Sequence, residues 1–287
     1  MNTVIIPTKN EPGITKVIEL IKITVPNAEI IVVDKSTDNT PTIAKKAGAK
    51  IVYQKGNGYG SAYITGFSEA KGETILMIDG DMSYDPRDFK KILKPIINNE
   101  ADLVLGNRFA GLKKGSMKLT NKIGNKFLTR LLNKLYKIDI QDSQSGMRAI
   151  TKKALEKLDL QETGMPLASE MLIEAVKKGL RIAEVPISYN PRIGKAKQNV
   201  YNGLRIASTT VRMIRDYNPL TTFSIIASAM IVPGLIIGVD VVIQWLTQGI
   251  ITRIASVVLS SMLILTGVFT FMIGLMIDLI VKEVRKK

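Results

Sequence analysis

Two aspartates separated by one glycine are the residues of this sequence best suited to chemistry. Asp79, Gly80 and Asp81 directly follow the apolar run 74–78, which is typical of a buried strand. Two carboxylates at the end of a strand can share a hard divalent cation, and that cation can also bind phosphate oxygens. The pattern therefore predicts a site for Mg²⁺ or Mn²⁺ at Asp79 and Asp81, although Asp-x-Asp also occurs in solvated turns.

The composition excludes several other kinds of chemistry. The 287 residues include no cysteine and no histidine, which excludes disulfides, thiolate nucleophiles, zinc sites built on these residues and an imidazole base. Acid–base catalysis must therefore use carboxylates or be unnecessary. The 40 Lys and Arg residues outnumber the 25 Asp and Glu residues and give a formal net charge of +15. This charge predicts an anionic partner: nucleic acid, a phosphate-bearing substrate or an acidic membrane surface.

Apolar, β-branched runs alternate with amphipathic stretches through residues 1–198, and this alternation predicts an α/β domain with a mainly parallel sheet. Ligands of such sheets bind beyond the carboxyl ends of the strands, and polar residues follow the first, second and fourth predicted strands. The predicted strands are 4–6, 29–33, 50–53, 74–78 and 102–105, and the predicted helices are 14–23, 41–47, 61–70 and 89–97.

The C-terminal part, 219–287, contains two long apolar stretches. Residues 223–246 and 254–281 are each long enough to cross a bilayer, so they predict a two-helix transmembrane hairpin. One basic residue, Arg253, lies in the connection, whereas basic residues are more numerous before the first span and after the second. The positive-inside rule then predicts a cell-membrane protein with its N-terminal domain and both termini in the cytoplasm.

Two basic amphipathic segments are predicted to lie on an anionic lipid surface. The first is 122–138, where lysines and an arginine flank an apolar stripe. The second is 199–218, which leads into the first span. The alternative is that either stripe packs on the domain. Because much of the positive charge gathers in these segments, nucleic-acid binding is disfavoured.

A glycine-rich segment, 56–61, superficially matches the dinucleotide-binding fingerprint. Its third glycine comes one residue early, and the acidic feature about 20 positions later is the Asp79 and Asp81 doublet instead of a single carboxylate. We expect a flexible loop that contacts a nucleotide or a helix N-terminus, or a plain turn.

Six ordered blocks between Val4 and about Arg205 resemble the GT-A-fold family 2 glycosyltransferases, in particular the dolichyl-phosphate and polyprenyl-phosphate sugar synthases. This resemblance implies a Rossmann-like GT-A catalytic domain followed by the hairpin. The blocks are Pro7-x-x-Asn10-Glu11, Asp34 with Ser36 and Asp38, Asp79-Gly80-Asp81, Gly106-Asn107-Arg108-Phe109, the run 142–148 from Asp142 to Arg148, and a final block from Glu184 through Tyr189 and Arg192 to Lys195.

The resemblance also implies a role for each matching residue. The catalytic set is Asp81, Asp142, Arg108 and Arg192, in which Asp142 matches a carboxylate that some members are thought to use as a base. The nucleotide-sugar set is Pro7, Asn10, Glu11, Asp34, Ser36, Asp79 and Gly80. The acceptor-phosphate set is Arg108, Lys122, Arg148, Arg192 and Lys195. Two departures concern Asp34-Lys35-Ser36, where relatives usually have two adjacent acids, and Asn121, where relatives often have arginine.

The absence of histidine is consistent with an acceptor that is itself a phosphate, because such an acceptor needs no imidazole base. A phosphate monoester is already about doubly negative near neutral pH, so it hardly needs a base. The enzyme must instead neutralise and align two anions, and arginine does this by binding phosphate in a bidentate manner. Arg148 has an alternative, which is a salt bridge to Asp142 or a backbone contact. A single displacement would invert the anomeric configuration.

We therefore predict transfer of a sugar, with UDP-N-acetylglucosamine favoured, from a nucleotide-sugar to dolichyl or polyprenyl phosphate, for glycan assembly such as protein N-glycosylation. UDP-glucose and GDP-mannose are alternative donors. A processive polysaccharide synthase normally has a Gln-x-x-Arg-Trp block, but the single tryptophan here, Trp245, lies in a span. A membrane-tethered nucleotide-binding protein without transfer activity is the alternative from another class, and homo-oligomerisation is left open.

Overall fold

The chain divides into two compact units at Thr210 and Val211. The structure, a computed structural model, describes residues 1–194 and 219–284. The predicted interfacial helix at 199–218 and the predicted phosphate ligand Lys195 lie outside the described residues.

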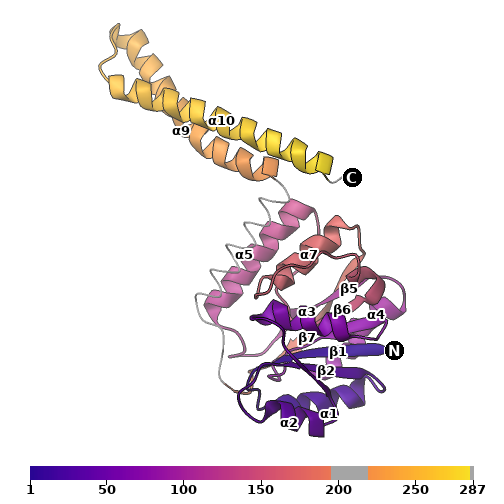
Figure 1. Cartoon of the computed structure of the whole chain (residues 1–287). Coiled ribbons are helices and arrows are strands. Elements are labelled where there is room, and N and C mark those ends of the chain that lie inside the picture. Colours follow the sequence, from indigo (N-terminus) through magenta and orange to yellow (C-terminus); the bar gives the residue numbers. More distant parts are fainter. Residues whose placement is uncertain (195–218, 285–287) are drawn as a thin grey trace. The chain divides into compact units, whose positions relative to one another are not determined.

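Seven strands form one sheet in the order β3-β2-β1-β4-β6-β5-β7 (Figure 1). Only β6 runs antiparallel to its neighbours, β4 and β5, and all other pairs are parallel. The predicted mainly parallel sheet is confirmed, but β6 and β7 were not predicted. The strands are β1 Asn2–Thr8, β2 Glu29–Asp34, β3 Lys50–Tyr53, β4 Thr74–Met77, β5 Leu103–Leu112, β6 Arg148–Thr151 and β7 Ile182–Tyr189.

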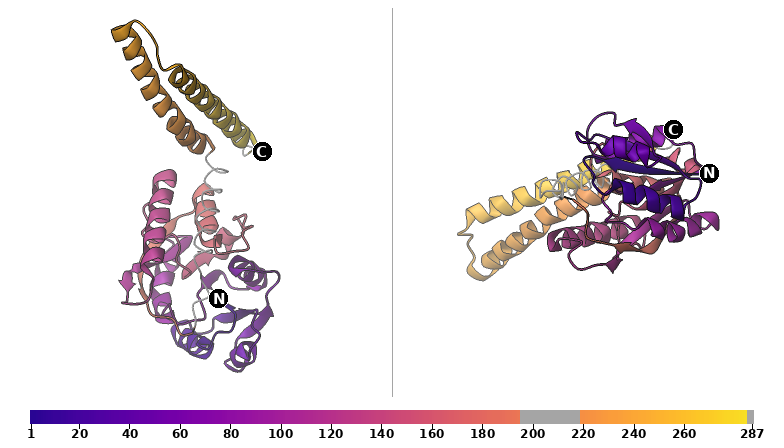
Figure 2. Two further views of the ribbon diagram at one scale, coloured as in Figure 1. Left: turned by 90° about the vertical axis from the view of Figure 1, so that its left-hand side faces the viewer. Right: turned by 90° about the horizontal axis from the view of Figure 1, so that it is seen from below.

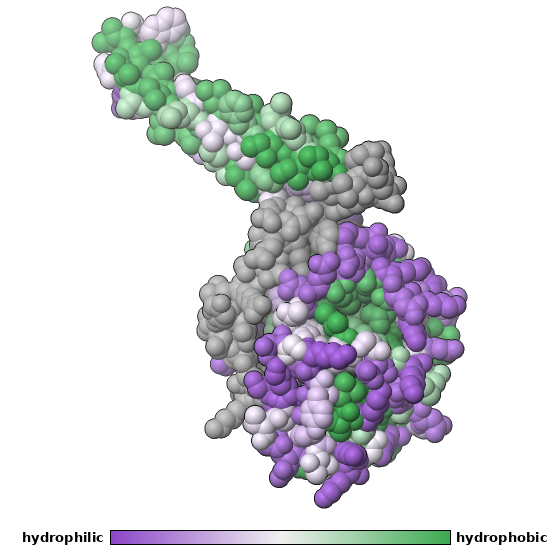
Figure 3. Space-filling model, in the orientation of Figure 1, coloured by the Kyte–Doolittle hydropathy of each residue, from purple (hydrophilic) through white to green (hydrophobic). Residues whose placement is uncertain are grey.

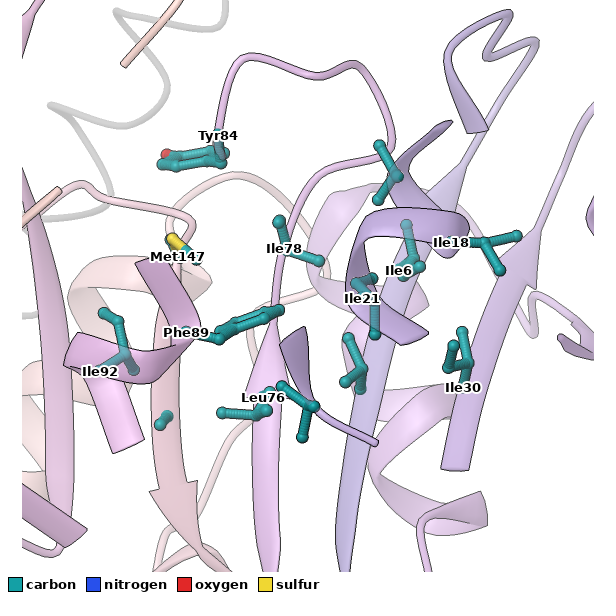
Figure 4. Close-up of a cluster of buried hydrophobic side chains, with 14 of the residues drawn as sticks. Ile6, Ile18, Ile21, Ile30, Leu76, Ile78, Tyr84, Phe89, Ile92 and Met147 are labelled. Atoms are coloured by element: carbon teal, nitrogen blue, oxygen red, sulfur yellow. The ribbon is translucent and has the colours of Figure 1, made fainter. Parts of the chain in front are cut away.

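Helices cover both faces of this sheet (Figures 1 and 2). Side chains alternate across a strand, so Ile6 faces the core formed with α1 and α4 (Figure 4), whereas its neighbour Ile5 faces α3. A Cβ at Gly66 of α3 would lie 2.5 Å from Ile5 Cγ2, so glycine lets this helix approach the sheet closely. The helices of this unit are α1 Ile14–Thr24, α2 Thr40–Lys46, α3 Tyr59–Glu69, η1 Pro86–Asp88, α4 Phe89–Ile97, α5 Leu119–Tyr136, α6 Lys152–Leu155 and α7 Leu167–Lys177.

Helix α5 corresponds to the first predicted amphipathic segment, and its apolar stripe is divided between two environments. Leu132 is fully buried, whereas Ile123 and Phe127 are 61% and 65% exposed. The C-terminal half of the helix therefore packs on the domain, as the alternative interpretation required. The N-terminal half keeps an exposed apolar face beside Lys122 and Lys126.

The C-terminal unit is a pair of helices, α9 Pro219–Gln248 and α10 Ile254–Val284. Both are long and apolar enough to cross a membrane, and they are too exposed to be core helices of a soluble domain, with 17% and 11% of their most apolar windows buried. On the face seen in Figure 3, the surface of these two helices is mostly hydrophobic. The predicted spans are thus confirmed as apolar helices.

Small residues hold the two helices together. A Cβ at Gly267 would lie 2.5 Å from Ile231 Cγ1 and 3.1 Å from the Ala227 carbonyl oxygen, so this glycine lets the side chain and backbone of α9 approach α10 closely. The Ser260 hydroxyl donates to the carbonyl of Gly234 at 2.8 Å. Close packing at glycine and hydrogen bonds from serine are the means by which helices associate within a bilayer.

Candidate active site

The aspartate pair lies at the carboxyl end of β4, as predicted. Asp81 is buried, and its Oδ1 accepts a hydrogen bond from the Ser83 amide at 2.9 Å. Its Oδ2 accepts from Arg192 Nε at 3.0 Å and also forms an ion pair with Arg192 Nη2. Asp79 Oδ1 accepts from the Tyr59 hydroxyl at 2.8 Å. Each carboxylate is thus oriented by a side chain from a different part of the chain.

The two carboxylates influence each other electrostatically. Burial and the negative charge of Asp81 raise the pKa of Asp79 to about 7, although the Tyr59 hydrogen bond and the positive charges of Arg192 and Arg108 act in the opposite direction. Two carboxylates kept so close together in a partly buried site favour the binding of a cation.

The loops after β1 and β2 are joined by hydrogen bonds, as expected for neighbouring parallel strands. The Asn10 amide donates to Ser36 Oγ at 2.8 Å, and the Thr37 amide donates to Asn10 Oδ1 at 2.8 Å. The Glu11 amide donates to Thr40 Oγ1 at 3.1 Å. A Cβ at Gly80 would lie 3.4 Å from Glu11 Cγ, which places the β1 loop beside the aspartate pair.

Asp34 lies at the centre of the contact between these two loops. Its carboxylate accepts from Thr8 Oγ1 at 2.7 Å, from Ser36 Oγ at 2.6 Å and from the Ser36 amide at 3.0 Å. Asp34 is 2% exposed. Asp34 therefore holds the loops after β1 and β2 together, whereas the side chains of Asn10 and Ser36 are more exposed than that of Asp34.

Arg108 and Asp142 form a second, buried ion pair. Arg108 Nε and Nη2 donate to the two oxygens of Asp142 at 2.6 and 2.7 Å, and the Arg108 amide adds a third bond at 3.1 Å. Glu184 of β7 accepts from the amides of Gln141 and Asp142, at 2.9 and 2.7 Å, and so holds this loop in place. The guanidinium also lies 5.4 Å from the centre of the Tyr189 ring.

The prediction that Arg148 binds the acceptor phosphate is wrong, and the backbone-contact alternative holds. Arg148 is fully buried on β6. Its guanidinium donates to the carbonyls of Ser145, Ala168 and Ser143 at 2.8, 2.8 and 2.7 Å. Burial lowers its pKa to about 10. The side chain therefore ties the 142–148 loop to α7 and has no surface to offer a phosphate.

The glycine-rich segment 56–61 ends in the first turn of α3, where it meets the backbone of 162–164. The Gly60 amide donates to the Gly164 carbonyl at 3.1 Å, and the Ser61 amide donates to the Thr163 carbonyl at 2.9 Å. A Cβ at Gly60 would lie 2.1 Å from the Glu162 carbonyl oxygen. The glycines thus allow close backbone packing, and these two amides are occupied by protein carbonyls.

Comparison with known sequences places this arrangement in a family. Residues 3–159, more than half of the chain, match the family described as Glycosyl transferase family 2. The chain belongs to this family.

Three relatives illustrate the family's range. A low-salt glycan biosynthesis hexosyltransferase of Haloferax volcanii is 41% identical over 68% of this chain, and the match spans only about half, 49%, of that relative. A dolichyl-phosphate hexose transferase of the same organism is 35% identical over 63% of this chain and 78% of the relative. A UDP-N-acetylglucosamine–dolichyl-phosphate N-acetylglucosaminyltransferase of Methanococcus voltae is 36% identical, with 55% and 72% coverage.

A solved structure confirms the GT-A fold of this family 2 domain. Glucosyl-3-phosphoglycerate synthase from Mycobacterium tuberculosis, in complex with Mn²⁺, UDP and glucosyl-3-phosphoglycerate, superimposes with a TM-score of 0.62. It is 22% identical, and the match covers 74% of this chain and 79% of that one. At this identity the likeness concerns the fold alone.

The oxygen ligands of the aspartate pair suit a hard divalent cation. Asp79 and Asp81 supply carboxylate oxygens, but no cluster of three or more acidic residues that could hold a metal occurs within the described ranges. Mg²⁺ commonly binds to one or two carboxylates and completes its shell with water and substrate phosphates. The pair therefore fits a cation that binds together with a nucleotide diphosphate.

The remaining predicted residues are not all brought to this centre. Pro7 lies within β1, where it pairs with Val33 of β2. Lys122 is half-buried on α5, and none of its described contacts joins it to Asp79 or Asp81. Sequence reasoning missed Tyr59, although it lies inside the glycine-rich segment. It also missed Tyr84, whose hydroxyl accepts from the Gly146 amide at 2.7 Å.

Proposed function

We propose that this family 2 glycosyltransferase transfers a sugar from a UDP-sugar to the phosphate of a membrane-embedded dolichyl or polyprenyl phosphate, with inversion at the anomeric carbon. The observation that carries the proposal is that two ion pairs, of Arg192 with Asp81 and of Arg108 with Asp142, lie at the carboxyl edge of the sheet. The two exposed apolar helices and two relatives named for dolichyl phosphate support the lipid acceptor.

The chemistry requires little beyond charge placement. The acceptor phosphate oxygen attacks the anomeric carbon, the bond to the nucleotide diphosphate breaks, and the diphosphate leaves with the electron pair. A divalent cation at Asp79 and Asp81 supplies charge stabilisation for the departing diphosphate. Arg192, whose side chain is 32% exposed and pairs with Asp81, would contact the acceptor phosphate in this proposal.

We assign Asp142 a positioning role in this reaction. Both of its oxygens accept from the Arg108 guanidinium, and the carboxylate is fully buried. It therefore orients Arg108 beside the aspartate pair, and a phosphate nucleophile makes a proton acceptor unnecessary. We propose that Arg108, oriented in this way, contacts a substrate phosphate.

The donor sugar is proposed from the relatives. Two of them carry hexose in their names and one carries UDP-N-acetylglucosamine. We infer a UDP-hexose as the first donor to test. UDP-N-acetylglucosamine is the second, because the Methanococcus voltae relative is named for it.

We also propose that the catalytic domain faces the cytoplasm. The basic residues at the two ends of the hairpin outnumber the single Arg253 of its connection, which is the charge asymmetry of a cytoplasmic domain. The exposed N-terminal half of α5 offers Ile123 and Phe127, beside Lys122, to an anionic lipid surface.

The decisive experiment is an assay of membranes containing the full chain with dolichyl phosphate and radiolabelled UDP-glucose, UDP-N-acetylglucosamine or GDP-mannose, with and without EDTA. We expect a lipid-linked sugar from one UDP-sugar and its loss with EDTA. Asp81→Asn should lower turnover at least about a thousandfold, since a metal ion stabilises such a transition state by several kcal/mol. Formation of no lipid-linked sugar from any donor would refute the proposal.

A further inference from the structure

The hydroxyl of Tyr59 is placed to control the geometry of the aspartate pair. It donates to Asp79 Oδ1 at 2.8 Å, and Tyr59 is the first residue of α3. We propose that Tyr59 is a positioning residue for the cation site: it holds Oδ1 of Asp79 so that Oδ2 is directed toward the shared cation. This inference rests on the proposed metal site at Asp79 and Asp81.

The position of Tyr59 is itself determined by the backbone around it. The next two amides of α3, of Gly60 and Ser61, donate to the carbonyls of Gly164 and Thr163. These carbonyls occupy donors that the first turn of a helix otherwise leaves unpaired. The helix therefore begins at a defined place, and the tyrosine on its first residue is held with it.

A buried carboxylate on α7 fixes the 161–164 segment in turn. Glu170 is 4% exposed, and its two oxygens accept from the amides of Gln161 and Glu162 at 3.0 and 2.9 Å. A continuous chain of contacts thus runs from α7 through this segment to α3 and on to Asp79. Glu170 acts through Tyr59 and does not touch the cation site itself.

The 142–148 loop packs against Tyr59 and Asp79 and leaves the tyrosine little freedom. A Cβ at Gly146 would lie 2.8 Å from the Tyr59 hydroxyl and 3.3 Å from Asp79 Oδ2. The glycine lets the 142–148 loop approach both groups. The ring of Tyr59 also meets Tyr63 edge to face, with 5.0 Å between the ring centres. The hydroxyl is therefore restrained from several sides while it bonds Asp79.

The neighbouring tyrosine offers a matched control. Tyr63 is fully buried on the same helix, and its hydroxyl lies 3.5 Å from that of Tyr59, but its described hydrogen bonds do not include Asp79. Tyr59→Phe and Tyr63→Phe each remove one hydroxyl and keep the ring. A general effect of losing a buried hydroxyl would therefore occur in both variants.

The test measures the binding of Mn²⁺ alone to the purified full chain in detergent, by electron paramagnetic resonance of the free ion. Partners that orient metal ligands typically contribute 10–100-fold to affinity, so Tyr59→Phe should weaken Mn²⁺ binding about tenfold. Tyr63→Phe should change it less than about twofold. Thermal unfolding of each variant shows whether it is folded.

Equal Mn²⁺ affinity of Tyr59→Phe and the unaltered chain would overturn the proposal. An equal loss in both variants would also overturn it, because the effect would not depend on the bond to Asp79. Asp79→Asn serves as the reference for a damaged site. Since no acceptor or sugar donor is present, the outcome is independent of whether the lipid acceptor proposed above is correct.

Discussion

The two arginine–aspartate pairs of the active site have the same chemistry but different surroundings. In the pair of Arg108 and Asp142 the side chains are 9% and 0% exposed, and the guanidinium occupies both carboxylate oxygens. In the pair of Arg192 and Asp81 the arginine is 32% exposed, and it occupies one oxygen while the Ser83 amide takes the other. We call Arg108 and Asp142 the closed pair, because both side chains are buried. We call Arg192 and Asp81 the open pair, because a ligand can reach the exposed part of Arg192.

The difference follows from where each arginine lies in the chain. Arg108 lies within β5, and its partner loop is held by Glu184 on β7. Arg192 follows the end of β7, in a segment bound to the site through backbone hydrogen bonds such as that from the Ile193 amide to the Asp81 carbonyl at 2.8 Å. Arg108, within an internal strand of the sheet, is held mainly by protein partners, whereas Arg192, on a connecting segment, keeps about a third of its side chain exposed.

The closed pair should be the more costly one to break for stability. Asp142→Asn leaves the Arg108 guanidinium buried without a counter-charge, which typically costs about 3–5 kcal/mol. Chemical denaturation of the detergent-solubilised chain, followed through the tyrosine signal of the domain, measures this loss. Asp85→Asn is the control, since Asp85 pairs with the exposed Arg87 and such pairs contribute about 0–1 kcal/mol. Similar losses in both variants would contradict the distinction.

The open pair should matter for turnover and cation affinity more than for stability. Arg192→Gln removes the proposed phosphate contact and should lower turnover about a hundredfold, as for loss of one donor to a charged transition state. It also frees Asp81 Oδ2 from a competing cation, so Mn²⁺ should bind several-fold more tightly. Arg181→Gln, which removes a surface pair with Asp102, should change neither. Weaker Mn²⁺ binding in Arg192→Gln would show that the arginine supports the cation.

The smallest effect is expected for the residue that braces the closed pair. Burial raises the pKa of Glu184, while the amides of Gln141 and Asp142 act in the opposite direction. Glu184→Gln replaces one accepting oxygen with a donor and should cost about 1 kcal/mol, the usual net worth of such a hydrogen bond. Thermal unfolding of the domain measures it, with exposed Glu73→Gln as the control. If Glu184→Gln lost as much stability as Asp142→Asn, Glu184 would be as important for stability as the Arg108–Asp142 ion pair itself.

The sequence predicted the arrangement of the sheet better than the detail of the site. The apolar, β-branched runs identified β1, β2, β4 and the beginning of β5, because buried strands of a parallel sheet are apolar along most of their length. The edge strand β3 was also identified, although it is partly exposed. Strand β6 is only four residues long and contains Arg148, so no hydrophobic pattern identified it. The position of Asp79 and Asp81 was correct, since it follows from the end of an apolar strand.

The roles of individual arginines could not be assigned from the sequence. Arg108, Arg148 and Arg192 were equally suited to bind phosphate by type. Arg148 binds three backbone carbonyls, and Arg108 is enclosed with Asp142. Tyr59 lies in the glycine-rich segment 56–61, but the sequence pattern drew attention to the glycines and not to the tyrosine.

The sequence by itself determined the fold class, the two apolar helices and the place of the aspartate pair, because these depend on hydrophobic periodicity, length and order along the chain. Only the tertiary structure decided which charged groups pair with one another. Arg192 and Asp81 are joined by a contact across 111 positions of sequence, and burial sets the partners and the pKa of such groups. A local pattern shows that a strand is apolar enough to be buried, but it does not show which charged side chains become buried with it or which distant residues they meet.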